Sequence, residues 1–223
     1  MRALDLFCGA GGASKGLMDA GFDVIGVDLA PQKHYPGAFI QVDVLKLPVM
    51  FLQMFDLVWA SPPCQAHTQL KSLPGAKKHL DLIPQTRALL QKAGVPYIIE
   101  NVEGAPLIDP VTLCGTMFGL GIPEAELHRH RIFETSFPVL TPECDHGLKP
   151  SVIGIYGGHV RNRQRREGSS NRGVADFTPD QGRQAMGTPW MNLKEMSQAI
   201  PPAYSQFLAR QWLGQQPHQE AYA

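Results

Sequence analysis

The chain has 223 residues, and its 20 lysines and arginines balance 20 aspartates and glutamates, so the formal net charge is zero. This length can bury a sizeable hydrophobic core, as one large domain or as a domain with a small appendage. A neutral chain lacks the overall positive charge typical of many nucleic-acid-binding proteins, so any surface for a polyanion must be local.

Cysteine usage and hydropathy favour a soluble protein of the reducing cytoplasm. The four cysteines lie far apart and form no C-x-x-C pair, which argues against a disulfide framework and against a four-cysteine zinc site. A strand-like segment begins at Ala3, so we expect no signal or transit peptide. No apolar run approaches the roughly 20 residues needed to cross a bilayer. We therefore expect a cytoplasmic monomer without membrane contact.

The first strand, expected over residues 3–8, runs into a glycine turn, Gly9-Ala10-Gly11-Gly12, which precedes a helix over residues 13–20. Glycines allow a backbone to approach a ligand closely at a helix N-terminus. The second strand, residues 23–27, ends at Asp28, about 20 residues after the turn, where nucleotide-binding folds place an acid on ribose hydroxyls. Alternatively, Asp28 is a helix-capping or loop acid.

Two further strands end in distinctive residues. The strand over residues 39–42 ends at Asp43, which could accept a hydrogen bond from an adenine amine or cap the following turn. The buried strand over residues 57–60 meets Pro62 and Pro63, which cannot continue a hydrogen-bond ladder. Cys64 then lies just past the carboxyl end of a strand, where open α/β sheets bind ligands, although a buried structural cysteine is the alternative. This alternation predicts an α/β fold with a doubly wound, mostly parallel sheet.

The middle of the chain supplies a polar loop and an acid. Residues 66–80 carry Lys71, Lys77 and Lys78 and predict a loop that closes over a phosphate-bearing substrate, unless it is merely solvated. After a helix over residues 82–93, an apolar strand over residues 97–99 ends at Glu100. Burial beside the strand that precedes Cys64 would raise the pKa of this carboxyl and let it donate a proton. The alternative is that Glu100 is an ordinary surface acid.

Residues 105–127 are expected to be connecting structure. Residues 129–134 alternate with period two, which predicts that Arg129 and Arg131 share one face of a strand. Two guanidinium groups on one face could clamp an acid or a carbonyl oxygen. The alternative is a strand with one solvated face.

The composition shifts after Thr135. Residues 137–182 are rich in Pro, Gly, Ser and Asn, and their basic cluster is the best candidate for contact with a polyanion, with a solvated loop as the alternative. Cys144-Asp145-His146 could form half a zinc site, but a partner pair at ligand spacing is missing, so we predict no metal. His128 and His130 fit surface positions as well as ligand positions. Helices over residues 193–199 and 203–213 return to the sheet, and residues 214–223 form a frayed terminus.

With these pieces in order, nearly the whole chain resembles the cytosine-5 DNA methyltransferase family. Asp5-Leu6-Phe7-Cys8-Gly9-Ala10-Gly11-Gly12 resembles its cofactor turn, Pro62-Pro63-Cys64-Gln65 its nucleophile motif, and Glu100-Asn101-Val102 its catalytic acid motif. Arg129-x-Arg131 matches its paired arginines. Residues 198–204 resemble its last block in a form similar to phage-encoded members. Whether the protein belongs to a restriction-modification pair or is an orphan phage enzyme stays open.

The resemblance implies a Rossmann-like class I methyltransferase fold with S-adenosylmethionine as cofactor. Phe7 would lie against the adenine and the glycine turn near the methionine end; Asp28 would hold the ribose and Asp43 the adenine amine. The family more often has Glu at the ribose position. The implied cofactor residues are Asp5, Phe7, Gly9, Gly11, Gly12, Asp28, Leu29, Asp43, Val44, Pro63 and Leu82.

The implied reaction is methylation of C5 in a cytosine flipped out of double-stranded DNA. Cys64 would add to C6, Glu100 would act at N3 and Arg131, paired with Arg129, would hold O2. The expected DNA contacts are Gln65, Lys71, Lys77, Lys78, Arg161, Arg163, Arg165 and Arg166. Residues 1–135 would form the catalytic domain, 136–185 the target-recognition region, 186–213 returning helices and 214–223 a flexible tail.

Three alternatives remain open at this point. An RNA methyltransferase acting on tRNA would use the same residues. A catalytically idle DNA-binding or decoy protein would keep the fold, although it would not need Cys64, Glu100 and Arg131 together. Transfer of a group other than methyl is the third.

Overall fold

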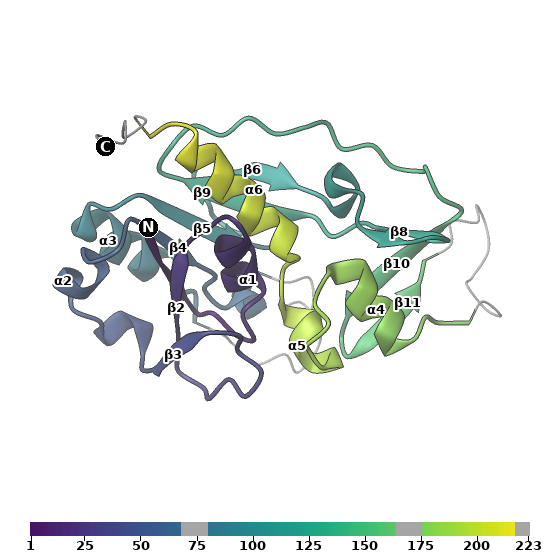
Figure 1. Ribbon diagram of the computed structural model, residues 1–223, viewed down its shortest axis with the longest axis horizontal. Helices are drawn as coiled ribbons and strands as arrows, with labels where there is room; N and C mark the ends of the chain where they lie inside the picture. Colours follow the sequence, from purple (N-terminus) through teal and green to yellow (C-terminus); the bar gives the residue numbers. More distant parts are fainter. Residues whose placement is uncertain (68–79, 164–174, 217–223) are drawn as a thin grey trace, which may run out of the picture.

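A seven-stranded sheet carries the N-terminal part of the chain in the computed structural model, which describes residues 1–67, 80–163 and 175–216 (Figure 1). The strand order is β3-β2-β1-β4-β5-β9-β6. The first five strands in this order are parallel, and β9 is antiparallel to both of its neighbours. Their bounds are β1 Arg2–Leu6, β2 Asp23–Asp28, β3 Ala38–Gln41, β4 Leu57–Ala60, β5 Tyr97–Asn101, β6 Val111–Leu113 and β9 Arg131–Thr135. The predicted doubly wound, mostly parallel sheet is confirmed.

The central strands are buried on both faces because alternate side chains enter different cores. Trp59 and Ile98 pack into one core, with α1 (Gly12–Asp19) and α6 (Pro202–Leu213). Val58 and Ile99 pack into the other, with α2 (Val49–Leu52) and α3 (Ile83–Ala93). The strand period of two thus sends neighbouring residues to opposite helical layers, as a parallel sheet covered on both faces requires.

The C-terminal helix α6 packs on the main sheet, in the core that holds Trp59 and Ile98, and it also contacts the first helix. A Cβ added to Gly16 of α1 would lie 2.0 Å from the carbonyl oxygen of Pro202, so only glycine permits this closeness. The Ser205 hydroxyl donates a hydrogen bond of 2.8 Å to the Ala13 carbonyl across the same contact. The end of the chain therefore closes over the helix that follows the glycine turn.

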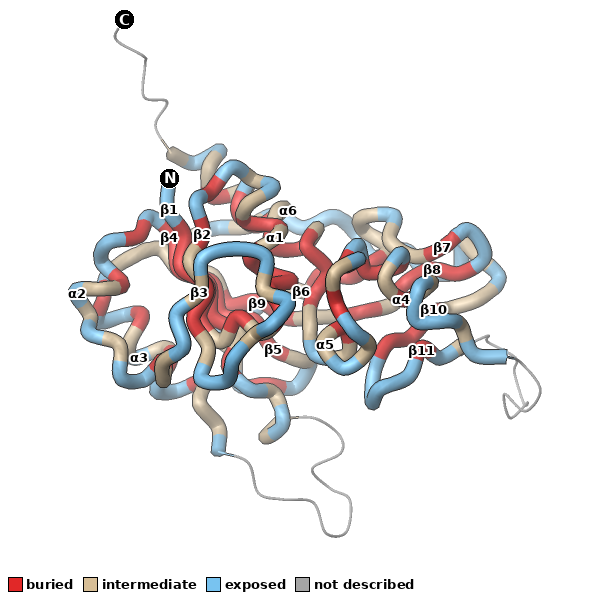
Figure 2. The backbone as a smooth tube through the Cα atoms, turned by 60° about the horizontal axis from the view of Figure 1, so that its bottom comes forward, coloured by how far each residue is buried: buried red, intermediate tan, exposed pale blue. Residues whose placement is uncertain are grey.

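A second sheet lies beside the first, with the order β11-β10-β8-β7 (Figures 1 and 2). Its strands are β7 Gly121–Ile122, β8 Ala125–Leu127, β10 Ser151–Tyr156 and β11 His159–Asn162, and α4 (Pro179–Met186) and α5 (Leu193–Gln198) pack on it. The expectation that residues 105–127 are connecting structure is wrong, because they contain β6, β7, β8 and the 3-10 helix η4 (Gly115–Phe118). The second sheet thus takes strands from both sides of residue 136.

No helix in the described ranges is long and apolar enough to span a membrane.

Candidate active site

The carboxyl ends of β1, β2, β4 and β5 meet at one edge of the main sheet because these strands are parallel. This edge carries the glycine turn after β1, Asp28 at the end of β2, and Cys64 shortly after β4. Glu100 lies within strand β5, one residue before its end. The ends of parallel strands are where open α/β sheets bind ligands.

The glycine turn leaves room for a ligand. Phe7, Gly9 and Gly11 have φ values of 58°, 50° and 79°, a region that favours glycine. The Gly9 amide donates a 3.0 Å hydrogen bond to Asp28 Oδ2, which joins the turn to the next strand. A Cβ on Gly9 would meet no described atom within 4 Å, whereas one on Gly11 would lie 2.5 Å from Pro36. The backbone at Gly9 therefore faces open space.

The other predicted cofactor residues fall into two groups. Asp28 and Asp43 accept hydrogen bonds of 3.0 Å from the amides of Ala30 and Leu45. Asp43 thus caps the 3-10 helix η1 (Val44–Lys46), and Asp28 closes the turn after β2, so each fills the local role considered as its alternative. Their contact with a ligand remains a prediction. Among the rest, Leu29 is 69% exposed, Pro63 is exposed, Leu82 is partly buried at the start of α3, and Val44 is buried.

Asp5 lies inside β1 and is fully buried. Its Oδ2 accepts a 2.5 Å hydrogen bond from Ser14, while Oδ1 has no partner among the described atoms. Burial raises the pKa of this carboxyl to about 7. Oδ1 of Asp5 is therefore a buried acceptor without a partner in the described part of the chain, beside a glycine turn that faces open space. S-adenosylmethionine has a positively charged sulfonium and a polar methionine end, so these residues are compatible with it.

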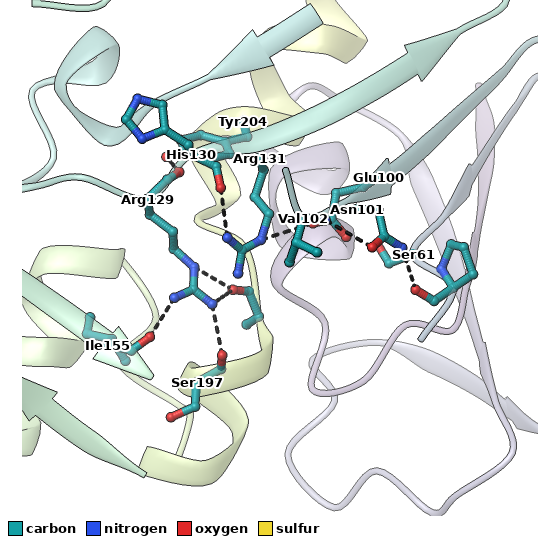
Figure 3. Close-up of polar contacts among 12 residues, drawn as sticks. Ser61, Glu100, Asn101, Val102, Arg129, His130, Arg131, Ile155, Ser197 and Tyr204 are labelled. Carbon is teal, nitrogen blue, oxygen red and sulfur yellow. Dashed lines mark hydrogen bonds and ion pairs between the residues drawn. The ribbon is translucent and has the colours of Figure 1, made fainter. Parts of the chain in front are cut away.

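Cys64 begins the 3-10 helix η2 (Cys64–Ala66) and is partly buried. The corner that presents it is fixed by β5, because Asn101 Nδ2 donates a 2.9 Å hydrogen bond to the Pro62 carbonyl (Figure 3). Asn101 Oδ1 in turn accepts a 3.0 Å hydrogen bond from the Val102 amide. The two prolines and Asn101 together hold the thiol at the sheet edge.

Glu100 and Arg131 form an ion pair beside this corner, with 3.2 Å between Oε1 and Nε (Figure 3). Burial raises the pKa of Glu100, and Arg131 and a hydrogen bond with Ser61 oppose that rise. Burial and then the negative charge of Glu100 raise the pKa of Cys64, while Arg131 lowers it. The thiol and the carboxyl are thus electrostatically coupled.

Arg129 does not share a strand face with Arg131, and that prediction is wrong. It precedes β9, is buried, and donates hydrogen bonds to the carbonyls of Ile155 (2.7 Å), Ser197 (3.0 Å) and Ala199 (2.6 Å) (Figure 3). Its own carbonyl accepts a 2.6 Å hydrogen bond from the Tyr204 hydroxyl. Arg129 therefore joins the second sheet and the last two helices to the start of β9.

A cavity of about 510 Å³ opens between the two sheets. Arg131 and Glu103 line it from the main sheet, and Tyr156, Arg163 and Ser197 line it from the other side. This cleft therefore leads to the arginine that pairs with Glu100.

Few of the predicted DNA contacts can be placed. Gln65 is exposed next to Cys64. Arg161 pairs with Asp176 at 2.7 Å, and Arg163 donates to the Tyr156 hydroxyl at 2.6 Å with its guanidinium 4.5 Å from the centre of that ring. Lys71, Lys77, Lys78, Arg165 and Arg166 lie outside the described residues. A DNA contact for any of these residues remains a prediction.

Sequence reasoning missed one constellation of residues. The structure brings Cys114 and His130 together with Cys144 and His146, so that their ligand atoms lie within 4.8 Å of one another. The prediction of no metal rested on the absence of a partner pair at ligand spacing. That pair exists, but its members come from separate segments, and the only local signal was Cys144-x-His146.

Comparison with known proteins gives one family match, to the N-terminal part of the chain, and several structural likenesses. Residues 1–107 match the family described as C-5 cytosine-specific DNA methylase. A DNA modification methyltransferase encoded within an E. coli prophage superimposes with a TM-score of 0.63 and 13% identity, covering 96% of this chain and 99% of that one.

Two other solved structures are similar. For a Spodoptera frugiperda DNMT2 mutant the TM-score is 0.64 at 12% identity, over 96% of this chain and 100% of that one. For the Entamoeba histolytica methyltransferase EhMeth it is 0.61 at 11% identity, over 96% and 98%. No curated protein matches the sequence. At such low identities, the structural likenesses establish the Rossmann-like fold alone.

Proposed function

We propose that the chain methylates C5 of a cytosine in double-stranded DNA with Cys64 as nucleophile. The match of residues 1–107 to the family of C-5 cytosine-specific DNA methylases supports this proposal. The observation that carries the proposal is the meeting of Cys64 with the ion pair of Glu100 and Arg131 at the sheet edge that bears the glycine turn. A binding module would not need a thiol coupled to a buried acid and an arginine.

The chemistry follows from the substrate. Cytosine C5 is a poor nucleophile, so the Cys64 thiolate first adds to C6 and makes C5 electron-rich. S-adenosylmethionine, when bound, supplies the methyl group as an electrophilic carbon. Loss of the C5 proton, with water as the acceptor, and β-elimination then release Cys64. We assign no side chain as the base for that proton.

Glu100 and Arg131 balance charge during the addition. The raised pKa of Glu100 favours its protonated form, which can donate a hydrogen bond or a proton to N3 of the ring. Protonation also removes the negative charge that raises the pKa of Cys64, and leaves Arg131 to stabilise the thiolate. A proton shift from thiol to carboxyl therefore prepares nucleophile and acid together, while Arg131 holds O2.

A cytosine inside a duplex cannot reach this thiol, so it must leave the base stack at a cost of a few kcal/mol. We propose that the cleft between the two sheets admits the DNA strand that carries the extruded cytosine. The cleft reaches Arg131, and Tyr156 and Arg163 line its wall. A cytoplasmic monomer remains our prediction, as do the domain division and the sequence recognised.

The test incubates the protein with labelled S-adenosylmethionine and duplex DNA, single-stranded DNA or tRNA, followed by mapping of 5-methylcytosine. We expect label in duplex DNA with the wild type and none with Cys64→Ser. Methylation of tRNA alone would contradict the choice of DNA. Label in a product other than 5-methylcytosine would contradict the reaction.

A further inference from the structure

A cluster of sulfur and nitrogen ligands lies outside the catalytic centre, at the junction of the two sheets. We propose that Cys114, His130, Cys144 and His146 bind one zinc ion. The ion fixes the irregular residues 136–150, which lead into β10 of the second sheet, against the start of β9. The proposal does not depend on which nucleic acid the protein methylates.

Two of the three sulfur–nitrogen distances in the cluster are close to those of a tetrahedral zinc site, and the third is shorter. Zinc lies about 2.3 Å from a cysteine sulfur and about 2.0–2.1 Å from a histidine nitrogen, which places neighbouring sulfur and nitrogen ligands roughly 3.5 Å apart. In the structure, Sγ of Cys114 lies 3.3 Å from Nε2 of His146. Sγ of Cys144 lies 3.4 Å from Nε2 of His130 and 2.9 Å from Nε2 of His146. All four ligand atoms lie within 4.8 Å of one another.

Three separate segments bring these atoms together. Cys114 is buried just after β6, at the start of η4. His130 immediately precedes β9, and Figure 3 shows its ring turned away from the guanidinium groups of Arg129 and Arg131. Cys144 and His146 come from the extended stretch before β10. Local sequence proximity explains only the last pair, so the convergence of the others is a property of the fold.

The surroundings support the ligand atoms. The Thr116 hydroxyl lies 3.3 Å from the sulfur of Cys114 and 3.7 Å from that of Cys144, placed to donate to a thiolate. The His146 ring stacks on His128 with 3.8 Å between centroids and 17° between planes. Oε1 of Glu126 lies 2.6 Å from Nε2 of His128 and accepts a 2.7 Å hydrogen bond from the amide of Gly147. Such second contacts orient metal ligands in known sites.

The ligand set selects the metal and its role. Two thiolates and two imidazoles suit zinc, and four protein ligands leave no open position for a substrate, which is typical of structural rather than catalytic zinc. Residues 136–150 include no helix or strand, and the ion would tie this stretch to both η4 and β9. It would also anchor His130, whose carbonyl accepts a 2.8 Å hydrogen bond from Arg131 Nη1.

Without a metal, the same cluster would be a set of hydrogen-bonded thiols or a disulfide between Cys114 and Cys144. The test measures metal in the full-length protein, purified without chelators, by mass spectrometry. We expect about one zinc per chain. His146→Asn and Cys144→Ser change exposed side chains and should each lower zinc content at least several-fold, while Cys8→Ser, which removes a cysteine far from the cluster, should retain it.

A second measurement identifies the ligands independently. The metal-stripped wild type, titrated with Co²⁺, should develop the visible absorption of tetrahedral cobalt bound to thiolates, and His146→Asn should weaken it. Three results would overturn the proposal: no stoichiometric zinc together with no cobalt spectrum, zinc retained in both ligand variants, or a Cys114–Cys144 disulfide in the protein as purified.

Discussion

Replacing Arg129 by lysine should destabilise the junction between the two sheets although it preserves the positive charge. The guanidinium reaches carbonyls from three places in the chain: Ile155 in β10, Ser197 in α5 and Ala199 just after it. A lysine has one nitrogen and cannot span this set, because its donors radiate from a single point. The change therefore separates the geometry of Arg129 from its charge.

The magnitude follows from the bonds that are lost. A lysine at this position could keep one of the three carbonyl partners and would leave two without a charged donor. Each hydrogen bond from a charged donor contributes about 1.5–3 kcal/mol, so we expect Arg129→Lys to lower the free energy of unfolding by roughly 3–6 kcal/mol. Against a total of about 5–15 kcal/mol for a typical domain, this loss is large.

Urea denaturation with linear extrapolation measures the loss directly. The matched control is Arg161→Lys, which alters an exposed ion pair with Asp176 and should change stability by less than about 1 kcal/mol. If Arg129→Lys lies within about 1 kcal/mol of the wild type, the role of Arg129 as a joint between the sheets is refuted. A direct catalytic role would then regain support.

Two further predictions concern buried acids. Glu100→Gln should slow single-turnover methylation by about 10²–10⁴-fold. It should also turn a bell-shaped dependence of the rate on pH into one that rises until Cys64 ionises, because the variant needs only the thiolate and no protonated carboxyl. An unchanged bell-shaped profile would exclude Glu100 as the acid. For Asp5, the native pKa of about 7 exceeds the unfolded value of 3.8, so the native state holds the extra proton and stability falls as pH rises from about 4 to 7. The shift corresponds to about 4 kcal/mol in all, at 1.36 kcal/mol per unit. Between pH 5 and 8 the wild type should lose roughly 3 kcal/mol relative to Asp5→Asn in urea unfolding, and parallel profiles for the two proteins would show that Asp5 is not shifted.

The main sheet and the catalytic centre were predictable because their signals are local. An apolar run followed by Pro62-Pro63 locates the end of β4, and a second apolar run locates the end of β5. Parallel pairing then brings Cys64 and Glu100 to one edge, whatever the rest of the chain does. The order of strands along the chain, with glycines after the first, was sufficient for the fold class.

What could not be predicted depends on distant partners. The period-two pattern placed Arg129 on a strand, but its buried guanidinium is fixed by carbonyls of residues 155 and 197–199. The second sheet pairs β8 with β10 in parallel across a connection that contains β9 and the irregular residues 136–150, and the short strand Ala125–Leu127 gives little periodicity to read. Cys114 and His130 come together because β6 and β9 pair Leu113 with Arg131, and Cys144 and His146 reach them from the irregular stretch before β10, so no local ligand spacing reveals the cluster.

The central claim is that Cys64 attacks the cytosine ring, and covalent trapping tests it most directly. Fluorine at C5 blocks the release step, so the wild type with S-adenosylmethionine and duplex DNA containing 5-fluorocytosine should form a complex that survives denaturation. Peptide mapping of that complex should place the modified base on Cys64, and Cys64→Ser should form none. A trapped complex that persists in Cys64→Ser, or one that maps to another cysteine, would contradict the account.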